Sequence, residues 1–307
     1  MKKYEEIGGI QMKDFVIMTD SCCDLPKEYI YENNVPFAKL PFSYNGKEFL
    51  DDLGQTVSQK QFFDDLRDGA LPNTSQANSE SFHKIFKSAA EQNKDIIYVG
   101  VSSGLSGTYN SANIGKVATL EEFPNIRIYI IDVLTASLGQ GLMVMKAVEM
   151  KKEGASAQEI VSEIQSLIQN LNTYITVDDL NFLKRGGRIS NVAATLGIVL
   201  HIKPILTLNH EGRVMPLLKI RGRKKSLTKL AELVRDKIRN PETQTIAICH
   251  GDCIEDAERL KQEILENVAV KEVIIHFIGP VVGRFSGPGG MGVFFIGEAR
   301  QHHIIDI

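Results

Sequence analysis

Short apolar runs alternate with longer amphipathic stretches through the first half of the chain. The runs are rich in β-branched residues and predict buried strands, whereas the stretches carry apolar residues at helical spacing. The predicted strands are 15–18, 96–101 and 126–131, and the predicted helices are 59–67, 79–91, 106–120 and 138–152. Strands joined by such helices are typical of a mainly parallel sheet with flanking helices. The sequence Tyr44-Asn45-Gly46-Lys47 predicts one antiparallel hairpin within this order.

The pattern changes near residue 171, after a polar helix that we expect at 156–169. A long antiparallel hairpin is predicted at 203–208 and 214–220. The remaining predicted elements are helices at 224–239 and 254–266 and strands at 245–249, 273–278 and 293–296. We therefore expect an α/β protein with an N-terminal domain over 14–170 and a mixed α/β domain over 171–307. No low-complexity linker separates the two, so we expect a ligand pocket between and within them.

Composition limits the classes of protein that fit. With 307 residues, the chain is long enough to form two domains and to enclose a cavity. Its 35 Lys and Arg residues against 38 Asp and Glu residues give a net charge of −3, which does not favour nucleic acid as a partner. Glu5 and Glu6 interrupt the place of a signal peptide, and no run approaches the roughly 18 apolar residues that span a bilayer. We therefore expect a cytoplasmic protein.

The four cysteines are too sparse for a disulfide framework in a chain of this length. Cys249, His250 and Cys253 are close together in the sequence, but no second cluster of metal-ligating residues accompanies them. We interpret these cysteines as buried free thiols, and we expect neither a metal site nor a cofactor.

Three polar segments follow predicted strands or helices and are candidates for binding. Asp20 and Ser21 end the first strand, where ligands gather in open α/β sheets, although capping of the next helix explains them equally well. The turn containing Thr74, Ser75 and the following glutamine offers hydroxyl and amide groups without charge, which suits a carboxylate, and a surface turn has the same composition. We therefore treat both segments as hypotheses.

The third segment, Ser102-Ser103-Gly104-Leu105-Ser106-Gly107-Thr108, lies between a strand and a helix. Free N–H groups at a helix N-terminus favour an anion. The sequence Gly100-Val101-Ser102-Ser103-Gly104 also matches the nucleophile elbow of hydrolases, which makes a serine esterase using Ser102 an alternative. No His-Gly-Gly segment for an oxyanion hole follows the earlier strands, and no histidine is identifiable as the base.

Two basic segments and one glycine-rich segment complete the candidates. Lys184-Arg185-Gly186-Gly187-Arg188 precedes an apolar helix predicted at 192–200, and Arg221-Gly222-Arg223-Lys224-Lys225 follows the long hairpin. Local basic patches suggest docking to an acidic partner or a membrane surface, with solvated surface charge as the alternative. The segment 279–292 is predicted as a glycine-rich loop. A dinucleotide site is disfavoured there because a strand follows it and Pro288 lies inside it.

Together these segments resemble the DegV family, in family order from about residue 14 to the C-terminus. The resemblance implies a two-domain α/β protein that encloses one long-chain fatty acid without acting on it. Some members are the lipid-carrying subunit of a bacterial fatty acid kinase and present the carboxylate to a separate subunit that uses ATP. By residue matching, the resemblance implies that Thr74 and either Ser102 or Ser103, with Ser103 favoured, bind the carboxylate. It further implies that Arg185, Arg188 and Arg221 contact the kinase subunit.

The sequence departs from the family pattern at two positions. Ala77 stands where the family often has proline, and Phe285 stands between Arg284 and Ser286 where the family usually has histidine. The histidine is expected to contact the carboxylate, so we expect Arg284 to replace it if its side chain turns inward. Alternatively, Phe285 closes the pocket over a different lipid. A lipid sensor or store without a kinase partner is therefore a second hypothesis beside the carrier.

Overall fold

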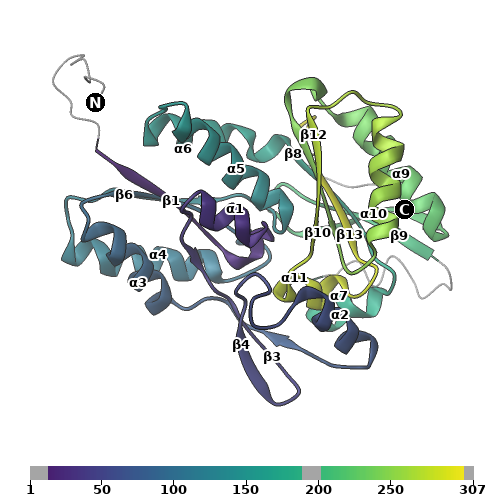
Figure 1. Cartoon of the computed structure of the whole chain (residues 1–307), viewed down its shortest axis with the longest axis horizontal. Helices are drawn as coiled ribbons and strands as arrows, with labels where there is room; N and C mark the ends of the chain where they lie inside the picture. The colour runs from purple at the N-terminus through teal and green to yellow at the C-terminus, as the bar shows by residue number, and fades with distance from the viewer. Residues whose placement is uncertain (1–12, 189–201, 301–307) are drawn as a thin grey trace.

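The computed structural model describes residues 13–188 and 202–300 (Figure 1). A parallel sheet has the order β2-β1-β6-β7, and a mixed sheet has the order β10-β9-β8-β13-β11-β12. The strands of the parallel sheet are β1 (Phe15–Asp20), β2 (Phe37–Ala38), β6 (Asp95–Gly100) and β7 (Ile128–Asp132). Those of the mixed sheet are β8 (Leu171–Thr176), β9 (Ile202–Leu208), β10 (Val214–Arg221), β11 (Thr245–His250), β12 (Glu272–Phe277) and β13 (Met291–Ile296). The predicted α/β class with one parallel and one mixed sheet is confirmed.

Helices cover both faces of the parallel sheet. They are α1 (Lys27–Glu32), α3 (Ser79–Ala90), α4 (Thr108–Glu122), α5 (Leu138–Lys152) and α6 (Ala157–Leu167). Alternate residues of β6 point to opposite faces: Ile97 and Val99 pack with α5 and α6, whereas Ile96 and Tyr98 pack with α3 and α4. Every residue of β6 is buried, as expected for a parallel strand covered on both sides.

Helix α5 joins the two halves of the molecule. It contacts β1 and β6 of the parallel sheet and β8, β11 and β13 of the mixed sheet. It is apolar around most of its circumference, which is typical of a helix buried on all sides. Gly139 lets the helix approach the mixed sheet, because a Cβ there would lie 2.6 Å from the ring of Phe294. The sequence of α5 thus fixes how closely the two sheets pack.

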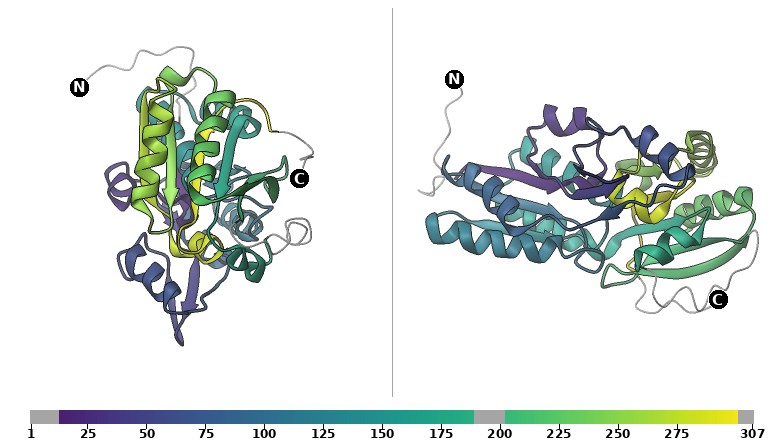
Figure 2. Two further views of the ribbon diagram at one scale, coloured as in Figure 1. Left: turned by 90° about the vertical axis from the view of Figure 1, so that its right-hand side faces the viewer. Right: turned by 90° about the horizontal axis from the view of Figure 1, so that it is seen from below.

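The outer face of the mixed sheet is covered by α9 (Arg223–Lys237) and α10 (Ile254–Leu265) (Figures 1 and 2). Leu230 and Val234 of α9 and Leu260 of α10 pack on Ile248 and Phe295 of the sheet. Three shorter helices, α2 (Gln59–Arg67), α7 (Leu180–Gly186) and α11 (Pro280–Ser286), lie near one another where the two halves meet (Figure 1). No helix within residues 13–188 and 202–300 is long and apolar enough to cross a membrane.

A small antiparallel sheet, β4-β3-β5, projects from the N-terminal half. The predicted hairpin is confirmed: β3 (Pro41–Tyr44) pairs with β4 (Lys47–Leu50) around a two-residue turn. Both turn residues have positive φ, 53° at Asn45 and 72° at Gly46, which is the geometry that Asn-Gly favours. The two-residue strand β5 (Asn73–Thr74) pairs with β3 and thereby fixes the position of Thr74.

Most predicted elements are confirmed within a few residues, and α2 and α5 have the predicted bounds. Five strands and helices of the described residues were not predicted: β2, β5, β8, α7 and α11. The glycine-rich segment 279–292 is not a loop throughout, because α11 occupies Pro280–Ser286. Proline is compatible with the first turn of a helix. Gly283 then lets α11 pack against α2, since a Cβ would lie 3.0 Å from the ring of Phe63.

Strand β8 was not predicted, because its sequence contains polar residues that are buried in the structure. Asn172 is 6% exposed, and its amide donates to the backbone oxygens of Asn170 and Glu298. Such local hydrogen bonds remove the cost of burying the amide. The helix predicted at 192–200 lies outside the described residues. The domain boundary at 170/171 stays a prediction.

Candidate functional site

A cavity lies between the carboxyl ends of β1 and β6 and the mixed sheet. Its volume, taken as the space open to the centre of a water-sized sphere, is about 160 Å³. On this measure roughly 10–15 Å³ holds one water-sized group, so there is room for on the order of ten to fifteen such groups. The lining is mostly apolar and includes Val101, Leu105, Ile175, Val177, Leu183 and Leu206. The cavity therefore suits a long aliphatic chain.

Two turns form a polar end of this cavity. Thr74, Ser75 and Gln76 come from β5 and the residues after it, and Ser106 comes from the turn before α4. Ser75 and Gln76 are exposed and Thr74 is partly buried, whereas the apolar wall at Val177 is fully buried. The polar residues thus lie at the mouth of the cavity.

The two turns are tied to each other. The side-chain amide of Gln76 donates to Ser111 Oγ in α4 at 2.9 Å. The same amide lies next to Gly107, where a Cβ would lie 1.9 Å from Gln76 Oε1. Only glycine leaves room for this contact, so the Gly107 position holds the Thr74 turn against the start of α4.

The structure separates the roles of the serines before α4. Ser102 is buried, donates through Oγ to Gly212 O at 3.0 Å and accepts from Gly104 N at 3.1 Å. Gly212 belongs to the turn between β9 and β10, so Ser102 joins the two halves of the molecule. None of the hydrogen bonds found for Ser102 within the described residues involves a histidine, which gives no support to a nucleophile activated by a base.

Ser103 is exposed and is not among the residues that line the cavity, and its contact with a head group stays a prediction. Its backbone N–H instead donates to Asp132 Oδ1 at 3.1 Å. Ser106 does line the cavity, with its Oγ 2.9 Å from Thr108 Oγ1. The hydroxyl that shares the mouth with Thr74 is therefore that of Ser106.

Two arginines at the mouth also differ from expectation. Arg284 does not turn into the cavity; its Nε donates to Pro72 O at 2.5 Å, and the side chain braces the turn that carries Thr74. Arg188, which is predicted to dock a partner, is exposed and also lines the cavity. Arg185 and Arg221 are exposed and are not part of the lining. Of these three exposed arginines, only Arg188 is also part of the cavity lining, and docking of a partner by all three stays a prediction.

Helix α11 forms part of the wall through Phe285 and Ser286. Ser286 is 6% exposed, and its Oγ has no hydrogen-bond partner in the part of the chain that the structure describes. A buried hydroxyl without a partner costs about 1–3 kcal/mol, so a polar ligand atom here would be stabilising. Ser75, in contrast, is exposed at the rim of the mouth.

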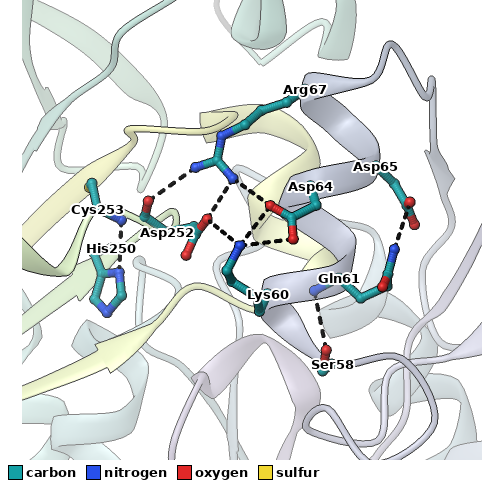
Figure 3. Close-up of polar contacts among 9 residues, drawn as sticks. All are labelled: Ser58, Lys60, Gln61, Asp64, Asp65, Arg67, His250, Asp252 and Cys253. Atoms are coloured by element: carbon teal, nitrogen blue, oxygen red, sulfur yellow. Dashed lines mark hydrogen bonds and ion pairs between the residues drawn. The ribbon is translucent and has the colours of Figure 1, made fainter.

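An ion-pair network joins α2 to the second half of the chain, where α2 also contacts α11 (Figure 3). Arg67 Nη1 lies 2.5 Å from Asp252 Oδ2, and Lys60 Nζ lies 3.6 Å from the same oxygen. The adjacent His250 accepts a hydrogen bond from Cys253 N through Nδ1, and burial lowers its pKa to about 4. His250 is therefore a neutral structural residue at neutral pH.

Three carboxyl groups are buried behind the inner wall of the cavity, next to its lining residues Cys22 and Ser137. Asp20 Oδ2 accepts hydrogen bonds from Tyr98 Oη at 2.6 Å and from Val101 N at 3.0 Å. Burial nevertheless raises the pKa of Asp20. Asp20 therefore organises the ends of β1 and β6 and is enclosed by protein groups.

Asp24 connects the two halves of the molecule. Its Oδ2 accepts from Ser137 Oγ at 2.5 Å, and its Oδ1 accepts from Gly279 N, at the start of α11, at 3.0 Å. Asp51 Oδ2 would lie 3.3 Å from a Cβ on Gly279 and has no hydrogen-bond partner among the described residues. Burial raises the pKa of Asp24 well above its usual value and that of Asp51 to about 7.

The cysteines are free thiols, and Cys22 and Cys249 line the cavity. Burial raises the pKa of both thiols, that of Cys249 to about 12, so they are unreactive at neutral pH. No group of three or more metal-ligating side chains occurs within residues 13–188 and 202–300. The lining thus contributes shape, with hydrogen-bonding groups at the mouth.

The fold and the cavity define an α/β protein with an apolar cavity between two sheets, and known proteins share this fold. The model of the DegV family matches residues 14–298. A DegV domain-containing protein of Clostridium perfringens is 43% identical over 290 residues, which are 94% of this chain and 100% of that protein. The chain belongs to the DegV family.

Two solved structures extend the likeness to three dimensions. A DegV family protein from Thermus thermophilus, described by its fatty acid binding, has a TM-score of 0.84 and 31% identity over 93% of this chain and 100% of its own. A DegV family protein from Ruminococcus gnavus, solved with vaccenic acid, has a TM-score of 0.84 and 26% identity over 91% of this chain and 99% of its own.

Sequence reasoning missed Ser106 and Arg188 as lining residues. Both lie within motifs that were recognised, but the motifs do not reveal which of several neighbouring side chains points inward. For Ser106, a signal was available: it lies two residues before the start of α4, where a hydroxyl can accept from the first N–H groups, and its Oγ accepts from Thr108 N at 3.2 Å. For Arg188 no sequence signal distinguished it from Arg185.

Proposed function

We propose that this protein binds one long-chain fatty acid, with the acyl chain in the cavity and the carboxylate at the mouth beside Thr74 and Ser106. The observation that carries the proposal is an apolar cavity that ends in neutral hydroxyl groups. The Thermus thermophilus and Ruminococcus gnavus relatives, which bind fatty acids according to their descriptions, support the same ligand class. Ser286 offers a further hydroxyl that lacks a partner among the described residues.

The energetics agree with this ligand. Burying a chain of some sixteen carbons at ~0.8 kcal/mol per methylene gives on the order of 10 kcal/mol before the cost of immobilisation. A few neutral hydrogen bonds of about 0.5–1.5 kcal/mol each then suffice for the head group. The site needs no catalytic residues to account for its architecture.

The finer proposal is that the bound carboxylate is presented to a separate ATP-using kinase subunit. The mouth is bordered by exposed residues such as Ser75 and Gln76, so a second protein could reach a carboxylate there without extracting the chain. Arg185 and Arg221 are exposed and available to dock such a subunit. A cytoplasmic location, as expected from the sequence, gives access to ATP.

A lipid store without a kinase is the second candidate, because Phe285 occupies the position at which the family usually has histidine. Two measurements separate these functions. Mass spectrometry of lipid extracted from the purified protein is expected to find one fatty acid per chain. Incubating the loaded protein with ATP and a cognate kinase subunit is expected to yield acyl phosphate. Bound lipid without formation of acyl phosphate would favour the lipid store over the kinase carrier. An absence of lipid after loading would exclude both functions.

A further inference from the structure

The ring of Phe285 lies between two guanidinium groups at the cavity mouth. The Cζ atoms of Arg188 and Arg284 lie 4.9 Å and 5.0 Å from the ring centroid. Both distances are within the roughly 6 Å at which an aromatic ring attracts a cation. One ring therefore contacts both the arginine that lines the cavity and the arginine that braces the Thr74 turn.

The position of the ring is fixed from the side of α7. A Cβ on Gly186 would lie 2.1 Å from Phe285 Cδ1, so the ring packs directly against the backbone at the end of that helix. Helices α7 and α11 are in direct contact. The Gly186 position thus provides the space in which Phe285 sits.

Arg188 spans the mouth of the cavity. Its Nε donates to Leu105 O at 3.2 Å, beside Ser106, and its Nη1 donates to Gly186 O at 2.7 Å. Both partners are neutral carbonyls, and an arginine has five N–H donors, so three remain for other groups. Because Arg188 lines the cavity, these donors are within reach of a ligand head group.

The positive charge at the mouth is not balanced by nearby acids. Within residues 13–188 and 202–300, none of Arg185, Arg188 and Arg284 forms an ion pair with a carboxylate. Burial lowers the pKa of Arg284, and the charges of Arg188 and Arg185 lower it further, because both guanidinium groups lie near that of Arg284. An anion bound at the mouth would relieve the repulsion between these like charges.

We infer that Phe285 is a positioning residue that holds Arg188 across the mouth, and that Arg188 makes the cavity select lipids with an anionic head group over neutral lipids of the same chain length. The inference rests on the proposed binding of fatty acid and adds the residue that determines head-group class. Thr74 and Ser106 bear hydroxyls that serve an acid or an alcohol alike, whereas a guanidinium distinguishes between them.

The test compares tetradecanoic acid with tetradecanol, each delivered from cyclodextrin to the delipidated protein at one ionic strength. The native protein is expected to bind the acid at least 10-fold more tightly than the alcohol. Arg188→Met is expected to weaken binding of the acid by roughly 10-fold or more and that of the alcohol less than 2-fold. Arg127→Met, which removes an exposed arginine that is not part of the cavity lining, is the matched control and should change neither affinity.

Phe285 is tested by two substitutions. Phe285→Leu keeps an apolar side chain but removes the aromatic face, and is expected to weaken binding of the acid roughly 3- to 10-fold with little change for the alcohol. Phe285→Tyr keeps the face and is expected to restore selectivity. This rescue separates positioning of the cation from simple packing.

The outcomes are distinguishable. If the native protein binds acid and alcohol equally, and Arg188→Met changes neither, the proposed lipid function stands and the inference is overturned. If Phe285→Leu weakens both ligands to the same degree, the ring acts only by packing, and its positioning role is overturned. If neither ligand binds, the proposed function fails and the inference with it.

Discussion

The inner wall and the mouth of the cavity carry opposite kinds of polar group. Behind the inner wall lie the buried carboxyls of Asp20, Asp24 and Asp51, which are enclosed by protein groups. At the mouth lie the hydroxyls of Thr74 and Ser106, with arginines around them. Burial raises the pKa of the three carboxyls and so favours their uncharged forms, whereas the arginines at the mouth are cations that attract an anionic head group. The charges at the mouth thus favour a fatty acid bound with its carboxylate outward.

The two regions also differ in their roles, because the inner region stabilises the fold and the mouth lies where a ligand would bind. Asp24 bonds groups from both halves of the molecule, so the inner region holds the fold together. Thr74 and Ser106 lie at the mouth and line the cavity. We therefore expect substitutions behind the inner wall to change the free energy of unfolding, and substitutions at the mouth to change affinity for lipid.

The largest expected effect is that of Asp51→Asn on the pH dependence of stability. Well below pH 3.8, the usual pKa of an aspartate, Asp51 is protonated in both states, and as the pH rises from there to about 7 the unfolded chain releases the proton before the folded one does. The native protein therefore loses stability over this interval, at up to about 1.4 kcal/mol per pH unit for one proton. Asp51→Asn removes this contribution, so the slope of unfolding free energy against pH should rise by up to that amount.

Urea unfolding at pH 4, 5, 6 and 7 measures this slope. Lipid affinity serves as the second readout, and it should change less than 2-fold because Asp51 does not line the cavity. An unchanged slope would show that Asp51 is ionised in the folded protein at these pH values. A large loss of lipid affinity would contradict the expectation that the inner region contributes to stability and not to binding.

The next largest effect concerns the apolar wall of the cavity between the inner region and the mouth. Val177 is fully buried and lines the cavity, so Val177→Phe places a ring in the space meant for the acyl chain. Displacing about three methylenes should cost about 2 kcal/mol, or roughly 30-fold in affinity for hexadecanoic acid. Isothermal titration is the measurement. Val117→Phe, at an exposed position of α4, is the matched control, and equal losses in both variants would argue against a chain in this cavity.

The smallest effect distinguishes Ser106, which lines the cavity, from Ser103, which does not. Thr74→Ala combined with Ser106→Ala should weaken fatty acid binding by about 1–3 kcal/mol, since two hydrogen bonds are lost. Thr74→Ala combined with Ser103→Ala should lose only the contribution of Thr74, because Ser103 is exposed outside the lining. Displacement of a fluorescent fatty acid compares the two. A greater loss with Ser103→Ala would restore the assignment made from the sequence.

Much of the framework could be predicted because it depends on local patterns. The strands β1, β6 and β7 and the helices α2 and α5 follow from apolar spacing, and the Asn45–Gly46 turn follows from the residues that tolerate positive φ. Helix α11 could not be predicted in this way, because its glycines signal a loop unless the packing of Gly283 against α2 is known.

The sequence by itself determined the fold class, the family and the neutral, hydroxyl-rich character of the turns at the mouth. Only the tertiary structure decided that Ser106 lines the cavity while Ser102 and Ser103 do not, and that Arg188 does while Arg284 does not. The physical reason is that adjacent side chains in a turn point in different directions. Which of them faces the interior depends on partners distant in sequence, such as Gly212 for Ser102 and Pro72 for Arg284.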